Sequence, residues 1–124
     1  MAERAVRAIR GATTVDGDEP TLIRRATREL LERIAARNGI APTDVVSVIF
    51  TVTNDLTSEF PARAARELGW SDVPLLCTME IPVPGALPRC IRVLLHIEST
   101  RARDALEHIY LGGARILRPD LLKD

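Results

Sequence analysis

The sequence predicts an α+β fold, in which a mixed β-sheet is accompanied by one long helix and two shorter ones. Apolar side chains recur at helical spacing from Ile23 to Ile34, which predicts the long helix. Two runs, 45–52 and 89–98, are rich in β-branched and other apolar residues and have the profile of buried strands. Because the chain has 124 residues, we expect one domain over residues 1–124.

The order of elements follows from the turn and capping residues between these apolar runs. Asp18 is a capping acid shortly before Pro20, and Asn38-Gly39 supplies a left-handed stop to the long helix. Pro61 opens a short helix, and Gly69 ends it. The predicted elements, in order, are strand 4–10, a loop from Gly11 to Gly17, helix 20–37, strand 45–52, helix 62–68, strand 73–80, strand 89–98, a helix from Ser99 or Thr100 to Tyr110 or Leu111, strand 114–117, and a tail from about residue 118 that is a candidate for flexibility.

Composition and charge exclude several classes of function. The formal net charge is zero and aromatic residues make up 3% of the chain, so we expect no nucleic-acid or membrane-surface partner. No apolar stretch is long enough to span a bilayer, and the N-terminus lacks a secretory signal. Cys77 and Cys90 lack metal-site spacing, and neither His96 nor His108 has a nearby Cys, Asp or Glu at ligand spacing. We therefore expect a reduced, cytoplasmic setting and no metal.

Arg92 is the first candidate for function, because it lies inside the apolar run 90–97. A guanidinium cannot lose its proton, so burial without an anionic partner would cost roughly several kcal/mol. Glu80, at the end of the preceding predicted strand, could supply that partner. In strand 89–98 Arg92 shares a face with Leu94 and His96, opposite the face of Ile91, Val93, Leu95 and Ile97. With no catalytic dyad visible elsewhere, the pattern indicates a pocket that holds an anion.

Other polar residues stand at the ends of the predicted elements. Arg10 ends the first strand, Tyr110 ends a helix and Arg118 opens the tail. Taken singly, each is more commonly a structural ion pair. Together they would suit a small, multiply charged anion, because the guanidinium fork matches a carboxylate. A pocket shared between subunits fits a chain of this size better than a deep pocket within one.

Five short segments make this pattern specific. They stand in the same order and at nearly the same spacing as in the trimeric, AroH-class chorismate mutases, which the whole chain resembles. Phe60-Pro-Ala-Arg-Ala-Ala-Arg-Glu-Leu68 also resembles the second helix of that family. The five segments are Arg10-Gly-Ala-Thr-Thr-Val15, Cys77-Thr-Met-Glu80, Cys90-Ile-Arg-Val93, His108-Ile-Tyr-Leu111 and Leu117-Arg-Pro-Asp-Leu121.

The resemblance implies a homotrimer whose sheets pack around a pseudo α/β barrel, with active sites in clefts between subunits. It implies the Claisen rearrangement of chorismate to prephenate, on the route to phenylalanine and tyrosine, without cofactor or metal. Arg92 would donate to the ether oxygen of the breaking bond, and Glu80 would accept a hydrogen bond from the ring hydroxyl, assisted by Cys77. Carried over by position, the catalytic residues are Arg92, Glu80 and Arg10, and the substrate-binding residues are Tyr110, Cys77, Phe60, Arg66, Leu117 and Arg118.

The chain departs from the family pattern in a few places. Arg63 stands where a lysine is common, and Gly112-Gly113 replaces a more polar segment. The tail after Arg118 is shorter than in relatives. In a regular strand Cys77 and Glu80 would point to opposite faces, so both can line a pocket only if the strand ends or bulges between them.

Two other functions are compatible with an arginine-lined pocket. One is a non-catalytic trimer that binds small carboxylates as a metabolite sensor, and the other is a different enzyme on this trimeric fold, such as the imine-deaminating family. Glu80 and Tyr110 at their present spacings favour the mutase over both. The decay of chorismate absorbance on addition of the protein would separate the three.

Overall fold

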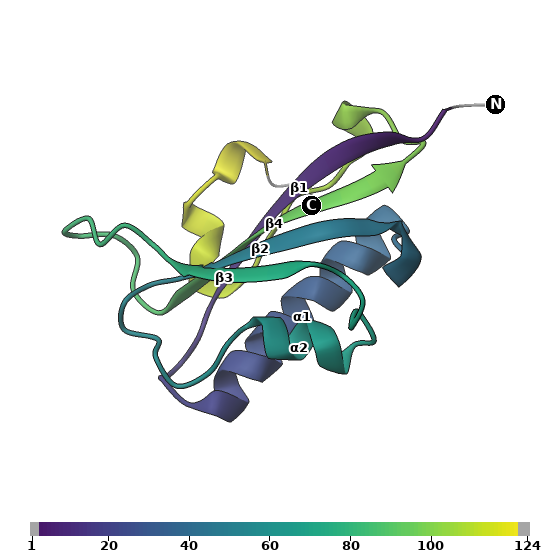
Figure 1. Ribbon diagram of the computed structural model, residues 1–124. Coiled ribbons are helices and arrows are strands. Elements are labelled where there is room, and N and C mark those ends of the chain that lie inside the picture. Colours follow the sequence, from purple (N-terminus) through teal and green to yellow (C-terminus); the bar gives the residue numbers. More distant parts are fainter. Residues whose placement is uncertain (1–2, 122–124) are drawn as a thin grey trace.

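The computed structural model describes residues 3–121, which form one five-stranded sheet with two α-helices. Both helices lie against the same face of the sheet (Figure 1). The predicted α+β class is therefore confirmed. The elements are β1 (Ala5–Thr14), α1 (Pro20–Asn38), β2 (Val45–Val52), α2 (Ala62–Glu67), β3 (Leu75–Met79), β4 (Cys90–Ser99) and β5 (Ile109–Tyr110).

The strands are arranged in the order β3-β2-β4-β1-β5. The central β4 runs antiparallel to both of its neighbours, β2 and β1. The outer strands β3 and β5 run parallel to β2 and β1 respectively, so the sheet is mixed as predicted. Because β4 pairs on both sides, a residue in it is held in register by two strands from distant parts of the sequence.

The core lies between the sheet and the helices, and it follows the predicted alternation. Val93 and Leu95 of β4 are buried against Leu30 and Ile34 of α1 in one cluster. Arg92, Leu94 and His96 are on the other face and only half-buried. Helix α1 ends at Gly39, whose backbone is left-handed with φ of 62°, as Asn38-Gly39 predicted.

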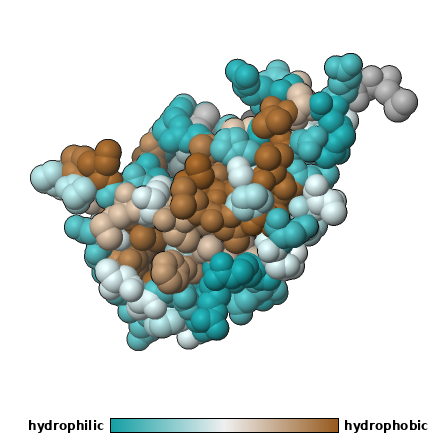
Figure 2. Space-filling model, viewed as in Figure 1, coloured by the Kyte–Doolittle hydropathy of each residue, from teal (hydrophilic) through white to brown (hydrophobic). Residues whose placement is uncertain are grey.

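Neither α-helix covers the second face of the sheet, on which the 3-10 helix Gly112–Ile116 packs against Ala12 of β1. Leu76 of β3, which is 60% exposed, and the half-buried Ile49 and Leu94 lie on this face. Apolar side chains form a band across the strands, and more gather on the loop that projects after β3, where Ile81 and Val83 are exposed (Figure 2). Contiguous apolar surface of this kind is typical of a face that packs against another molecule.

The structure corrects three expectations in the N-terminal half. The segment from Gly11 to Thr14 is part of β1 and not a loop, because β1 pairs with β4 from Ala5–Ser99 to Thr14–Cys90. Arg10 is consequently in the middle of the strand. Asp18 does not cap α1: the N-cap is Glu19, without a side-chain hydrogen bond, and the Asp18 carboxylate binds Thr57 and Ser58.

The C-terminal segment differs most from the prediction. The expected helix from residue 99 or 100 to 110 or 111 is replaced by a single 3-10 turn, Arg103–Ala105, and by β5. Ile109 and Tyr110 pair in parallel with Gly11 and Ala12 of β1, which supplies the backbone hydrogen bonds that a helix would have made. The strand expected at 114–117 is instead a 3-10 helix, Gly112–Ile116.

Substitution of Gly11 with alanine should destabilise the fold by about 1–3 kcal/mol, because the site is overpacked. A Cβ at Gly11 would lie 2.8 Å from Ile34 Cδ1 and 3.1 Å from the Ile109 carbonyl oxygen. Gly17→Ala is the matched control, since its Cβ would meet only Leu22 Cδ1 at 3.6 Å. Urea unfolding of both variants measures the difference, and equal midpoints would contradict the packing described here.

Candidate active site

Strand β4 places Arg92 at the centre of the uncovered sheet face. Its register partners are Thr51 on β2 and Ala12 on β1. Since successive side chains of a strand alternate between faces, burying Val93 on the helix side turns Arg92 to the other side. The side chain is 35% exposed, so it lies at the edge of solvent and is less buried than its apolar surroundings in the sequence suggest.

Glu80 is the anionic partner of Arg92, as the sequence predicted. The Arg92 Nε lies 3.6 Å from Glu80 Oε2, an ion pair that is too long for a hydrogen bond. Glu80 follows the end of β3, and its backbone N–H donates to the Val52 carbonyl at 2.8 Å. The Thr51 hydroxyl donates to the Glu80 carboxylate. The carboxylate is thus fixed from two sides.

One donor of Arg92 stays unsatisfied. Its Nε is buried and has no hydrogen-bond partner among residues 3–121. A buried donor without a partner is costly and is one of the features that mark functional sites. The ion pair with Glu80 offsets part of the cost of burying the charge, yet the hydrogen-bonding capacity of this N–H is not used within the described chain.

Four of the predicted site residues line one depression, which has a volume of about 510 Å³. Arg10 comes from β1, Arg92 from β4, Tyr110 from β5, and Glu80 from the end of β3. Ile49, Val93 and Leu94 supply apolar lining. A largely apolar concavity with a few convergent polar groups is the usual form of a small-molecule site.

Phe60 and Cys77 line a second depression, of about 370 Å³, on the same chain. Arg10, Glu80, Arg92 and Tyr110 do not line it. Phe60 is 68% exposed. Cys77 and Glu80 line different depressions of the chain, as expected for opposite faces of a regular strand. Strand β3 ends at Met79, but this does not bring the two residues into one pocket of the chain.

Cys77 is a protonated thiol at neutral pH. Burial raises the pKa of the Cys77 thiol, while the backbone N–H of Ala62 and the positive charge of Arg66 lower it to a smaller extent. A neutral thiol is a weak hydrogen-bond donor and a poor nucleophile. Arg66, exposed on α2, acts on Cys77 through its charge but does not line the Phe60–Cys77 depression.

Leu117 and Arg118 lie near the Arg92 half of the site. Leu117 packs against the cluster that contains Ala12 and Tyr110. The Arg118 guanidinium makes two hydrogen bonds to the Asp120 carboxylate, at 3.0 and 2.8 Å. The tail after Leu121 lies outside the described residues, so its predicted flexibility is not tested.

The glycine pair that departs from the family pattern has a structural cause. The Gly113 N–H donates to the Thr14 hydroxyl at 2.9 Å. A Cβ at Gly112 would lie 2.9 Å from the same oxygen, and the φ of Gly112 is +55°. The other departure, Arg63, lies 3.8 Å from Glu59.

Sequence reasoning missed one residue of the site, Thr51. It faces Arg92 across β2 and β4 and donates to Glu80. The alternation within 45–52 could have placed it on the face opposite Phe50. Its partnership with Arg92 depends on strand register, which is not local information.

Comparison with known proteins decides the family. The family described as chorismate mutase type I matches residues 6–121. Over 117 residues the chain is 54% identical to the chorismate mutase AroH of Thermus thermophilus, covering 94% of this chain and 96% of that protein. The chain belongs to the chorismate mutase type I family. The resemblance inferred from the five segments is therefore confirmed.

Two further relatives agree. The chorismate mutase AroH of Bacillus subtilis strain 168 is 44% identical over 117 residues, covering 94% of this chain and 92% of that protein. A solved structure, the chorismate mutase from Clostridium thermocellum, has a TM-score of 0.87 and 46% identity, covering 88% of this chain and 97% of that chain. The protein is thus a chorismate mutase, an isomerase, in preference to a non-catalytic carboxylate-binding trimer. Within residues 3–121 no helix has the length and apolarity needed to cross a membrane.

Proposed function

We propose that this chorismate mutase rearranges chorismate to prephenate in clefts between the subunits of a homotrimer, with Arg92 as the principal catalytic residue. The observation that carries the proposal is the buried Arg92 Nε, which has no hydrogen-bond partner in the described chain, in a side chain that borders a depression shared with Arg10, Glu80 and Tyr110. Decay of chorismate absorbance, measured with the purified protein, tests the activity directly.

The chemistry needs a fixed positive charge and no acid–base pair. In a Claisen rearrangement the C–O bond breaks ahead of C–C bond formation, so negative charge grows on the ether oxygen. A cation already aimed at that oxygen stabilises the transition state more than the ground state. Arg92 suits this role because its charge is permanent and Glu80 holds it in place at 3.6 Å.

The remaining residues of this half would select the reactive shape of the substrate. Arg10 and Tyr110 would bind carboxylates, and Glu80 would accept a hydrogen bond from the ring hydroxyl. Holding these groups at fixed positions favours the compact conformer in which the two reacting carbons meet. The Arg118 guanidinium, near Tyr110, would add positive charge at the rim.

Two observations support a site formed between subunits. The Phe60–Cys77 half and the Arg92 half line separate depressions of one chain, so each half needs a complement. The uncovered sheet face also bears exposed apolar side chains, which a second copy would bury. In this arrangement Phe60, Cys77 and Arg66 of one subunit would face Arg92 and Glu80 of the next. A cytoplasmic location and independence from cofactors and metals remain predictions.

Replacement of Arg92 with lysine should lower kcat by about 100- to 1000-fold with little change in KM, because the planar fork acts chiefly in the transition state. Arg33→Lys, an exposed position on α1, is the matched control and should behave like the wild type. Steady-state kinetics on chorismate measures both. A near-normal kcat for the Arg92 variant would remove Arg92 from its proposed role.

Replacement of Thr51 with valine should lower kcat/KM about 10-fold, because Glu80 loses a hydrogen bond to its charged group. Thr51→Ser keeps the hydroxyl and should retain most of the activity. Thermal unfolding of both variants controls for stability. Equal kcat/KM for valine and wild type would show that this hydrogen bond does not position Glu80.

Mixed trimers test the shared site. Arg92→Ala and Phe60→Asp chains, each inactive alone, should recover about a quarter of wild-type activity when unfolded together and reassembled, because one interface in four would unite two intact halves. A mixture of Arg92→Ala with Arg10→Ala should recover none, since both changes damage the same half. Equal behaviour of the two mixtures would contradict a site built across subunits.

A further inference from the structure

The position of the Phe60 side chain needs an explanation, because most of the residue is exposed. It lies on the loop between β2 and α2, and the residue is 68% exposed. Packing within its own chain therefore does not fix the ring. A side chain that forms the wall of a binding site needs a supporting set of contacts, because small displacements weaken binding and catalysis.

Asp18 is the first contact that holds this loop. Its carboxylate accepts the Thr57 N–H at 3.0 Å and hydroxyl at 2.9 Å, and the Ser58 N–H at 3.0 Å and hydroxyl at 2.8 Å. These hydrogen bonds, that of the Ser58 hydroxyl foremost, lower the pKa of Asp18 below its ordinary value. The residue that the sequence suggested as a helix cap is thus a clamp on the loop.

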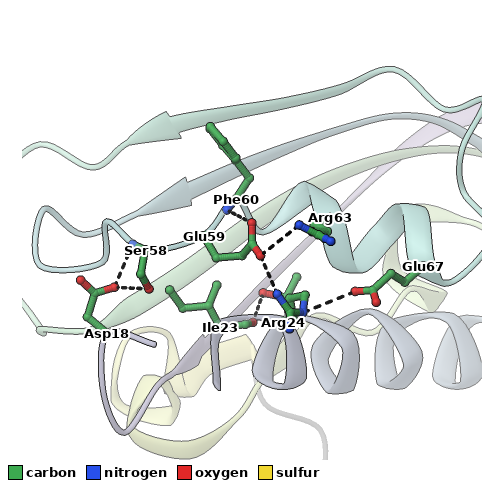
Figure 3. Close-up of polar contacts among 9 residues, drawn as sticks. Asp18, Ile23, Arg24, Ser58, Glu59, Phe60, Arg63 and Glu67 are labelled. Carbon is green, nitrogen blue, oxygen red and sulfur yellow. Dashed lines mark hydrogen bonds and ion pairs between the residues drawn. The ribbon is translucent and has the colours of Figure 1, made fainter. Parts of the chain in front are cut away.

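Glu59 is the second contact, and it reaches Phe60 itself. Its Oε1 accepts the Phe60 N–H at 3.0 Å, and its Oε2 accepts an N–H of Arg24 on α1 at 2.7 Å (Figure 3). The Glu59 side chain is only 10% exposed. The hydrogen bond from the Phe60 backbone, followed by that from Arg24, lowers the pKa of Glu59.

Asp18 joins the loop, at Thr57 and Ser58, to the segment that precedes α1, and Glu59 joins it to Arg24 of α1. Arg24 also lies 3.8 Å from Glu67 of α2, and Arg63 lies 3.8 Å from Glu59, so the network includes both helices. Figure 3 shows the Phe60 ring directed away from α1 while its backbone is tied toward that helix. The loop is fixed on one side and presents its aromatic ring on the other.

We propose that Asp18 and Glu59 are positioning residues, which hold Phe60 where it completes the substrate site of a neighbouring subunit. This inference rests on the proposed function, in which Phe60 lines that site. In this role both carboxylates act through the backbone of residues 57–60, although Glu59 itself lines the Phe60–Cys77 depression. The simpler role, a contribution to stability alone, predicts a different pattern of kinetic effects.

A double-mutant cycle separates the two roles. Glu59→Ala and Phe60→Ala should each raise KM for chorismate about 10-fold with little change in kcat, since an apolar wall binds substrate and transition state alike. If Glu59 acts through Phe60, the double variant should have the KM of Phe60→Ala alone. Glu67→Ala is the matched control, because it removes another carboxylate beside Arg24 that does not bind the loop.

The outcomes distinguish the inference from the function on which it rests. Additive effects in the cycle, or an unchanged KM for Glu59→Ala beside a raised KM for Phe60→Ala, overturn the positioning role and leave the shared site intact. An unchanged KM for Phe60→Ala overturns the placement of Phe60, and the inference with it. If Glu59→Ala does not fold, Asp18→Asn takes its place in the same cycle with the same expected KM pattern.

Discussion

A single guanidinium on an open sheet face sets the conditions for the rest of this structure. Arg92 cannot shed its charge, so the fold must supply an anion and keep water partly away. Glu80 supplies the anion, 3.6 Å from the Arg92 Nε. The flanking strands β1 and β2 shield the guanidinium partly from water. The pairing is incomplete, because the Nε stays buried without a hydrogen bond in the described chain. Electrostatic stabilisation of a polarised transition state requires a positive charge that is fixed in place and still has an unused hydrogen-bond donor.

The sheet topology determines which residues surround Arg92. Placing β4 between β2 and β1 brings Thr51 and Ala12 beside Arg92, and adding β5 to β1 brings Tyr110 to the same depression. Both α-helices lie on the opposite face, and the face that carries the charge leaves apolar residues such as Leu76 exposed. The chain carries two separate depressions, and the loop of the exposed Phe60 is tied to Asp18 and to Arg24.

Local patterns predicted the elements that local forces stabilise. The apolar stripe of α1, its left-handed stop at Gly39 and the two faces of β4 all appear where the sequence placed them. Predictions failed where backbone partners are distant. The segment after Arg10 is extended because it pairs with β4. Tyr110 is in a strand because it pairs with Ala12 of β1. Asp18 has a common capping residue type, but it finds its donors 39 and 40 residues away.

By itself, the sequence determined the family, the class of fold and the identity of the charged residues, since motif spacing and side-chain periodicity are properties of the chain alone. It also indicated Glu80 as the partner of Arg92. Only the tertiary structure joined Thr51 to Glu80 and divided the predicted site into two depressions. The physical reason is that strand register and the end of β3 fix these neighbours, and both arise from pairing between segments far apart in the sequence.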